Sequence, residues 1–282
     1  KVMSRRSIVL LMVALGIVGL AEVVAHARDP LPVGYPVTAR TKECINVGWH
    51  YHLGDLPGAE ALNFDCSTWE TVSVPHTLKL TSLALDGCSD DKTQPTFHRD
   101  IAWYRRTVEV SKNPGKVFLE FEGAHQVTDA WINGHHAGQH AIGGYTPFHF
   151  DITAYVHPGN NSVALRLDNR RRNDTPPDPG PFDYVKFSGL YRDVYLVETN
   201  ALHVTFPWED FYAGVFVTTP TVDPLNKNAT VAVRTTVRNE CEQMRRCRIL
   251  TRVIDREGVV VMRLQDQKQI LPGADHTFNQ CG

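Results

Sequence analysis

Apolar and polar residues alternate along most of this 282-residue chain, and no long segment repeats its apolar residues with a helical period. In 116–122 the apolar residues share one face and two glutamates lie on the other. In 161–169 the same pattern leaves Arg166 and Asp168 pointing outward. Period-2 alternation is typical of half-buried β-strands, and many short strands at this spacing indicate a sandwich. The predicted fold class is therefore all-β.

Turn signals and a change of pattern near Thr199 divide the chain into two predicted domains. Asn133-Gly134 directly follows the predicted strand 127–132 and signals a hairpin, because both residues tolerate positive φ. The pattern beyond Thr199 predicts four more strands, at 214–218, 230–239, 246–255 and 259–264. We predict a jelly-roll sandwich over 28–199 and an immunoglobulin-like sandwich over 200–282, which is incomplete because no closing strand is evident.

The N-terminal residues have the pattern of an export signal. A basic stretch at 1–6 precedes the apolar run 8–21, and small residues flank His26. This pattern predicts a signal peptide over 1–27 that is cleaved after Ala27, with an uncleaved anchor as the alternative. The basic stretch also resembles a twin-arginine signal. We expect a secreted or periplasmic protein that is free of the membrane once the signal is cleaved.

Charge and cysteine content restrict the classes of partner and crosslink. The net charge of −2 gives no basis for nucleic-acid binding. In an oxidising compartment the six cysteines are disulfide candidates, and we predict that Cys241 pairs with Cys247 across a hairpin loop. Cysteine and histidine spacings typical of zinc sites do not occur. One metal-binding alternative remains, in four histidines near the Asn-Gly hairpin: His135, His136, His140 and His149.

Two segments, 81–100 and 170–186, are long for connections in a compact sandwich, and such connections are usually functional or disordered. The first contains Asp86, Asp90, Asp91 and His98, and the second contains Asp174, Asp178, Phe182, Asp183 and Tyr184. Carboxylates accept hydrogen bonds from hydroxyl groups, and aromatic rings stack on the apolar face of a pyranose. The two loops therefore favour a site for a neutral sugar, with exposed polar loops as the alternative.

The segment "GGYTPFHFDITAYVHPGNNSVALRLDN" at 143–169 resembles the sugar-binding domain of glycoside hydrolase family 2, which includes β-galactosidases, β-mannosidases and β-glucuronidases. Five further segments resemble the family in the expected order: "NVGWHYHLGD", "STWETVSVPHT", "WYRRTVEV", "DAWINGHHAG" and "SGLYRDVYL". Together they cover residues 44–198. The resemblance implies a galactose-binding-like jelly roll followed by an immunoglobulin-like domain.

The resemblance also implies where catalysis takes place. Family members take both catalytic glutamates from a (β/α)₈ barrel that follows the immunoglobulin-like domain, so we expect no catalytic residue in this chain. Asn239-Glu240 has the dipeptide type of the family's acid/base, but we expect Glu240 to be a hairpin residue. The chain's own barrel is then its main partner, and an oligomer is compatible with the sequence.

"DYVKFSG" places Asp183 where the β-galactosidase branch has an aspartate that contacts the non-reducing galactose and a nearby sodium ion. The alternative is a loop carboxylate in water. A companion is expected from Asp90 or Asp91, although segment 81–100 matches the family poorly and leaves the sugar open. We expect no cofactor in this chain and sodium or magnesium in the full-length enzyme.

The predicted function is that of the N-terminal, non-catalytic part of a secreted retaining exo-glycosidase acting on terminal β-linked sugars, foremost a β-galactosidase. A β-mannosidase or β-glucuronidase of the same family is one alternative. A free-standing secreted carbohydrate-binding protein is another.

Overall fold

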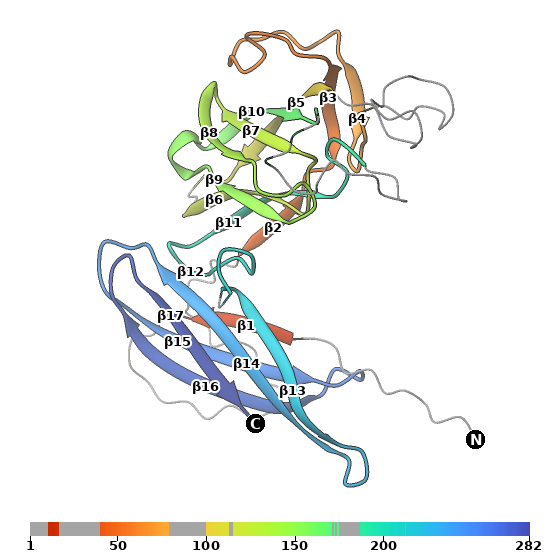
Figure 1. The fold of residues 1–282 in the computed structure, drawn as a ribbon. Helices are drawn as coiled ribbons and strands as arrows, with labels where there is room; N and C mark the ends of the chain where they lie inside the picture. Colours follow the sequence, from red (N-terminus) through yellow and green to blue (C-terminus); the bar gives the residue numbers. More distant parts are fainter. Residues whose placement is uncertain are drawn as a thin grey trace, which may run out of the picture. The chain divides into compact units, whose positions relative to one another are not determined.

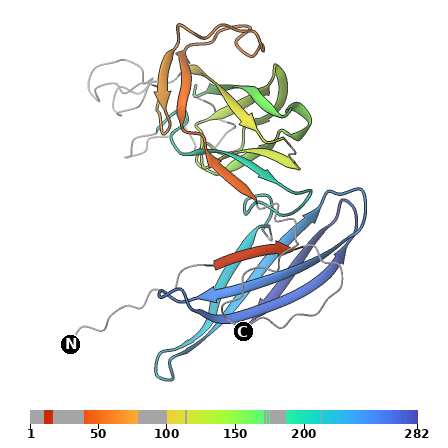
Figure 2. The ribbon, with the colours of Figure 1, turned by 180° about the vertical axis from the view of Figure 1, so that it is seen from behind.

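The computed structural model describes residues 11–16, 40–78, 100–112, 115–170, 172, 174, 187–211 and 213–282. Within these residues the chain is built from β-strands, and its only helical element is the short 3₁₀ turn η1 (Thr153–Tyr155). The chain forms two compact units (Figures 1 and 2). The first spans Arg40–Asn200, and the second combines the described residues 11–16 with Ala201–Gly282. The all-β prediction is confirmed. In the described part, no helix has the length and apolar character needed to cross a membrane.

The first unit is a sandwich of two antiparallel sheets, drawn as two layers in Figure 1. One sheet has the order β4-β3-β5-β10-β7-β8, from strands Glu70–Ser73, Val47–Leu53, Ile101–Val110, Gly159–Asp168, Val127–Ile132 and His135–His140. The other has the order β2-β11-β6-β9, from strands Thr41–Cys44, Val194–Thr199, Lys116–Phe121 and Phe148–Asp151. A core of aromatic and aliphatic side chains from both sheets fills the space between them.

Local sequence signals account for much of this sandwich. On β10 the alternate residues Val163, Leu165 and Leu167 are buried in the core, as their period-2 spacing predicts. Asn133 and Gly134 have φ of 51° and 83°, so the Asn-Gly pair makes the predicted hairpin between β7 and β8.

One glutamate of β6 departs from the simple pattern. Glu120 points away from the core, yet its side chain is 6% exposed because Lys42 Nζ lies 2.7 Å from Glu120 Oε1. The outer face of this sheet is therefore partly covered by its own charged pair, which alternation alone does not predict.

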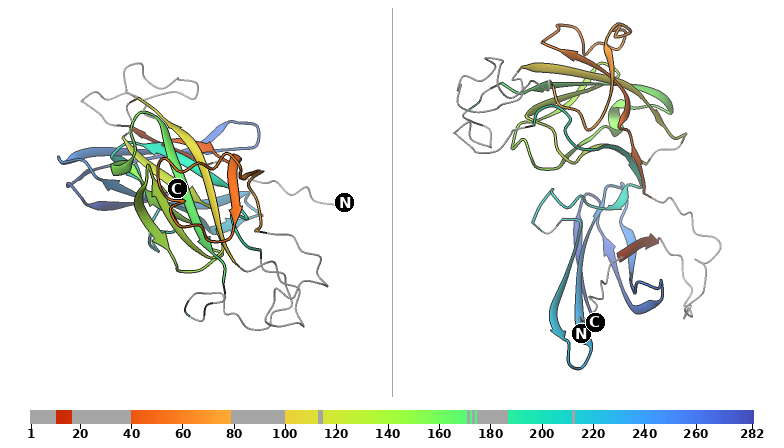
Figure 3. Two further views of the ribbon diagram at one scale, coloured as in Figure 1. Left: turned by 90° about the horizontal axis from the view of Figure 1, so that it is seen from above. Right: turned by 90° about the vertical axis from the view of Figure 1, so that its right-hand side faces the viewer.

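The second unit also has two antiparallel layers, which Figure 3 shows in its right-hand view. In one layer β14 (Asn228–Asn239) pairs with β12 (Leu202–Val204) and β13 (Val215–Asp223), and it pairs with β17 (Asp275–Cys281) as well. The other layer has the order β1-β15-β16, from strands Leu11–Gly16, Arg245–Ile254 and Val260–Ile270.

Strand β1 lies within the segment that the sequence predicts to be a signal peptide. Its residues pair antiparallel with β15, from Leu11 opposite Val253 to Gly16 opposite Arg248. The pairing shows that this apolar segment has strand-forming character. Cleavage after Ala27 stays a prediction, because pairing does not report on processing.

Both Cys241 and Cys247 are free in this structure, so their pairing stays a prediction. The prediction assumed a hairpin, but β14 and β15 belong to different sheets, so residues 240–244 cross from one layer to the other. Cys247 packs in the core of the second unit, where burial raises the pKa of its thiol to about 12. The buried Asn239 side chain holds the crossing instead, accepting from Cys241 N at 3.0 Å and donating to Gln243 O at 3.0 Å.

Candidate functional site

The two segments that the sequence predicts to be long loops begin and end at neighbouring points of the first sandwich. At the start of the first loop, Thr77 Oγ1 lies 3.1 Å from Ser188 Oγ, and Leu78 N donates to Ser188 Oγ at 3.4 Å. His76 N also donates to Leu190 O at 2.7 Å. The start of the first loop is therefore bound to the end of the second.

The other two loop ends are joined in the same way. Asn169 N donates to Asp100 O at 2.9 Å, directly beyond the pairing of Asp168 with Ile101. All four loop ends thus leave one end of the first sandwich. We call this the loop end, defined by residues 76–78, 100, 168–170 and 187–190. The predicted sugar-contacting residues Asp90, Asp91 and Asp183 lie outside the described residues, so their roles stay predictions.

A buried polar network lies beneath the loop end. His76 Nδ1 is 2.8 Å from Tyr104 Oη, and Tyr51 Oη donates to Leu78 O. Burial raises the pKa of Tyr104 and lowers the pKa of His76, so both side chains are held neutral at pH 7. A Cβ at Gly189 would lie 2.5 Å from Tyr104 Oη, and φ there is +76°, so this position requires glycine. These contacts fix the loop end from below.

A second buried pair supports the side where the second loop begins. His125 Nδ1 hydrogen-bonds to Asn169 Oδ1, and both residues are buried. The His125 ring packs 4.9 Å from the Tyr145 ring. Backbone hydrogen bonds also run both ways between His125 and Gly189, at 3.0 and 2.9 Å. His125 therefore links the start of the second loop to its end.

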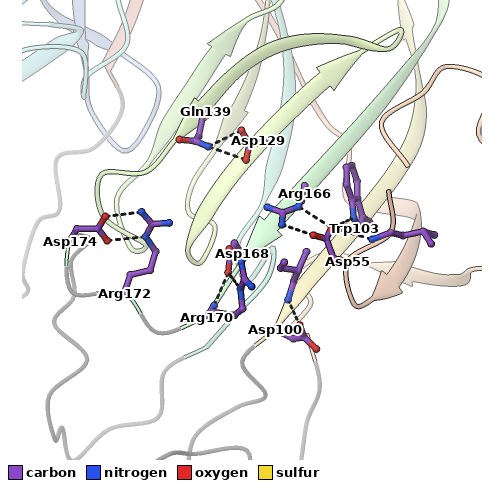
Figure 4. Close-up of polar contacts among 12 residues, drawn as sticks. Asp55, Asp100, Trp103, Asp129, Gln139, Arg166, Asp168, Arg170, Arg172 and Asp174 are labelled. Carbon is purple, nitrogen blue, oxygen red and sulfur yellow. Dashed lines mark hydrogen bonds and ion pairs between the residues drawn. The ribbon is translucent and has the colours of Figure 1, made fainter. Parts of the chain in front are cut away.

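Charged side chains near the loop end are paired with one another (Figure 4). Arg170 Nη2 lies 2.6 Å from Asp168 Oδ2, and Arg172 Nη2 lies 2.7 Å from Asp174 Oδ2. Burial alone would raise the pKa of Asp168, but the hydrogen bonds from Arg170 outweigh burial and lower it. Because these cations are compensated within the chain, the described part of the loop end suits a neutral ligand better than a polyanion.

A further polar row crosses the outer face of the six-stranded sheet. Arg166 pairs in register with Trp103 on one side and Asp129 on the other, and Asp129 pairs with Gln139. Figure 4 shows Arg166 directed to Asp55 and Gln139 directed to Asp129. Hydrogen bonds from Arg166 lower the pKa of Asp55.

Sequence reasoning missed this row for a specific reason. The Asn-Gly hairpin signal alone would place Asp129 opposite Gly138. A register shift between Ala130 and Trp131 places Asp129 opposite Gln139 instead. Alternation on β10 did indicate that Arg166 faces outward, but it did not indicate the partners of Arg166.

The histidine alternative for metal binding is wrong. Among the described residues no group of three or more His, Cys, Asp or Glu side chains could hold a metal ion. The four histidines serve other contacts: His135 stacks on Tyr155, His136 contacts Asp129, His140 stacks on Phe148, and His149 packs against Phe118. The predicted sodium neighbour, Asp183, lies outside the described residues.

Glu240 lies in the second unit, just after β14, where its Oε2 is 3.6 Å from His203 Nδ1. It belongs to the crossing between the two sheets and not to a hairpin. The position agrees with the prediction that Glu240 has a structural role, although the predicted kind of turn is wrong.

The model of "Glycosyl hydrolases family 2, sugar binding domain" matches residues 44–200. A β-galactosidase of Thermoanaerobacter pseudethanolicus is 36% identical over 77% of this chain and 27% of its own length. A β-glucuronidase of Formosa agariphila is 31% identical over 79% of this chain and 23% of its own length. The chain therefore spans about a quarter of the length of these relatives.

Solved structures show the same likeness. Bacteroides uniformis β-glucuronidase 2, covalently bound to cyclophellitol-6-carboxylate aziridine, superposes with a TM-score of 0.71 and 27% identity. The superposition covers 86% of this chain and 28% of that one. A putative β-galactosidase from Bacteroides fragilis gives a TM-score of 0.71 at 25% identity, over 86% and 35% of the two chains.

Proposed function

Because the chain belongs to glycosyl hydrolase family 2, we propose that it is the N-terminal, non-catalytic part of a retaining exo-glycosidase that removes terminal β-linked sugars. The convergence of four loop ends on one end of the first sandwich carries this proposal. Two loops that leave a rigid frame at one place can supply residues to a single sugar pocket. A stable sandwich beneath them limits the entropy lost when that pocket binds sugar.

Within this proposal the two loops contribute the substrate contacts. Asp183 accepts hydrogen bonds from the terminal sugar and lies beside a sodium ion in the full-length enzyme, and Asp90 or Asp91 is its companion. Retaining cleavage needs two carboxylates about 5 Å apart, an acid/base and a nucleophile. Within this proposal both come from a barrel later in the full-length chain. The barrel is the principal partner of the two sandwiches.

We propose a β-galactoside as the substrate, with a β-glucuronide or β-mannoside as the alternative. Relatives named β-galactosidase and β-glucuronidase both match most of this chain, so the family likeness leaves this choice open. We propose export for the protein because of the pattern at 1–27, followed by release into a periplasmic or extracellular space.

The test uses the full-length enzyme and a panel of nitrophenyl β-glycosides. We expect the β-galactoside to have the highest kcat/KM, and Asp183→Ala to lower that value at least about tenfold, since a lost substrate contact leaves a sugar hydroxyl unpaired. Asp174→Ala is the matched control, because Asp174 pairs with Arg172 near the base of the same loop. Unchanged activity in Asp183→Ala would refute the substrate role.

The coding sequence beyond Gly282 separates this proposal from a free-standing carbohydrate-binding protein. We expect it to continue into a barrel with two glutamates in catalytic positions. A stop codon at this point would favour the binding protein and would exclude the exo-glycosidase.

A further inference from the structure

We propose that the outer face of the six-stranded sheet carries a carbohydrate-binding platform for a neutral, extended β-linked glycan. The outer platform consists of Trp131, Asp129, His136, Gln139 and Arg166, from strands β7, β8 and β10. This proposal does not depend on the proposed sugar pocket at the loop end, because the two share no residue.

One part of this sheet face is covered, and the other part carries the exposed side chains of His136 and Gln139 on β8. Residues 54–69 pack Leu56, Phe64 and Trp69 against Trp103 and its neighbours on the β5 side. Trp131 stands at the border of this small cluster and is only partly buried. The part with exposed side chains therefore borders an aromatic ring, and aromatic rings stack on the apolar face of a pyranose.

Polar groups surround that ring at sheet spacing. Trp131 lies opposite His136, and the next pair along the same two strands is Ala130 with Gly138, followed by Asp129 with Gln139. The ring centroids of Trp131 and His136 are 5.0 Å apart. Neighbouring side chains on one face of a sheet are separated by roughly 5–7 Å, which is close to the width of a sugar ring. One pyranose on Trp131 therefore has hydrogen-bonding groups within reach.

The hydrogen bonds within the platform hold these groups in defined orientations. Gln139 Nε2 donates to Asp129 Oδ1 at 2.9 Å and to Oδ2 at 3.1 Å, while His136 Nε2 lies 3.1 Å from Asp129 Oδ1. The Asp129 side chain is 12% exposed, whereas that of His136 is 49% exposed. With its nitrogen held by Asp129, Gln139 directs its amide oxygen away from the carboxylate, where a sugar hydroxyl can donate to it.

Charge compensation on this face selects against an ionic ligand. Arg166 donates through Nε and Nη2 to the two oxygens of Asp55, at 3.0 and 2.8 Å, so its charge is already neutralised by a fork of hydrogen bonds. Asp129 likewise accepts from two neighbours. A neutral glycan gains hydrogen bonds here without breaking an ion pair, whereas a polyanion would meet the Asp129 carboxylate without a free cation on the platform.

The flat shape of the face determines which part of a glycan it takes. A sheet surface contacts one side of a sugar and cannot enclose a chain end, so internal sugars of an extended glycan fit better than a single terminal sugar. We expect weak binding, with a Kd on the order of 1 mM for a short glycan.

The experiment titrates the full chain with β-1,4-galactohexaose and, separately, with galactose, and follows binding by calorimetry and tryptophan fluorescence. We expect the hexaose to bind at least about fivefold more tightly than galactose. Trp131→Ala should weaken hexaose binding about tenfold. Equal affinity for galactose and the hexaose would overturn the proposal, because it would indicate a site for a single terminal sugar.

Two further variants keep the test valid if Trp131→Ala unfolds. Gln139→Ala changes an exposed side chain and should weaken hexaose binding about threefold. Trp208→Ala, in the second unit, is the matched aromatic control and should leave binding unchanged. Wild-type affinity in Gln139→Ala and in folded Trp131→Ala would refute the platform.

Discussion

The two sandwiches are built from similar strands but bury very different interiors. Between its sheets the first encloses a broad core rich in aromatic side chains, including Trp49, Tyr104 and Phe121, all fully buried. The second encloses a smaller apolar core, and the buried polar side chains Thr251 and Gln280 lie in its interior. Burial of a large apolar core stabilises the folded state and can offset the conformational entropy that is lost when long connections are ordered. A small core that contains polar groups stabilises the folded state less.

Only some of the buried polar groups in the second sandwich have hydrogen-bond partners. Thr251 Oγ1 donates to Gln280 Oε1 at 2.6 Å. Among the described residues, Thr235 Oγ1 and Gln280 Nε2 have no hydrogen-bond partner. Each such buried group costs about 1–3 kcal/mol relative to a satisfied one. The first sandwich also contains unsatisfied buried groups, at His50 Nδ1 and Thr128 Oγ1, so the difference between the two sandwiches lies in the larger aromatic core of the first.

The largest expected effect is from Trp49→Ala in the first sandwich. Trp49 is fully buried, its Nε1 donates to Ile45 O at 2.7 Å, and its ring packs 6.4 Å from that of Tyr104. We expect the free energy of unfolding of this sandwich to fall by about 3–5 kcal/mol, because the substitution leaves a large cavity. Hydrogen exchange resolved by segment measures it. We expect faster exchange in β5 and β10 of the first sandwich and little change in β14 of the second. Equal acceleration in all three strands would show that the cavity does not act on the first sandwich alone.

Asn239→Ala should have a smaller effect, confined to the second sandwich. The side chain of Asn239 makes three hydrogen bonds with backbone groups, including a donation to Ile270 O at 2.9 Å. Its loss should reduce the stability of this sandwich by about 2 kcal/mol, because buried backbone groups lose their partners. Asn226→Ala, in an exposed turn, is the control. If the two variants unfold at the same denaturant concentration, the hydrogen bonds of the Asn239 side chain contribute nothing to the stability of this sandwich.

The smallest effect concerns the pH dependence of the first sandwich. Burial lowers the pKa of His76, and Glu70 opposes this only in part. Since the folded pKa lies below the unfolded value of about 6.5, His76 favours the folded state above that pH, and this contribution is lost as the pH falls through the folded pKa. We expect His76→Gln to reduce the slope of Tm against pH between about pH 7 and 5 by a few degrees at most. An identical slope in both proteins would contradict the assigned burial.

Local patterns were sufficient for some elements and insufficient for others. Alternation on β10 and the Asn-Gly pair predicted strands and a hairpin because both depend on residues close in sequence. The crossing at 240–244 was predicted as a hairpin because the choice between two sheets depends on distant partners. The predicted pairing of Cys241 with Cys247 was based on that hairpin.

The sequence by itself determined that this chain forms strands, where several turns fall, and which family it resembles, since each depends on local composition or ordered motifs. Only the tertiary structure decided that Thr77 meets Ser188 and that Asp100 meets Asn169. These contacts join residues about 70 to 110 positions apart, as the register of two sheets dictates. The same register, shifted by one residue between β7 and β8, placed Gln139 beside Asp129 and so produced the outer platform.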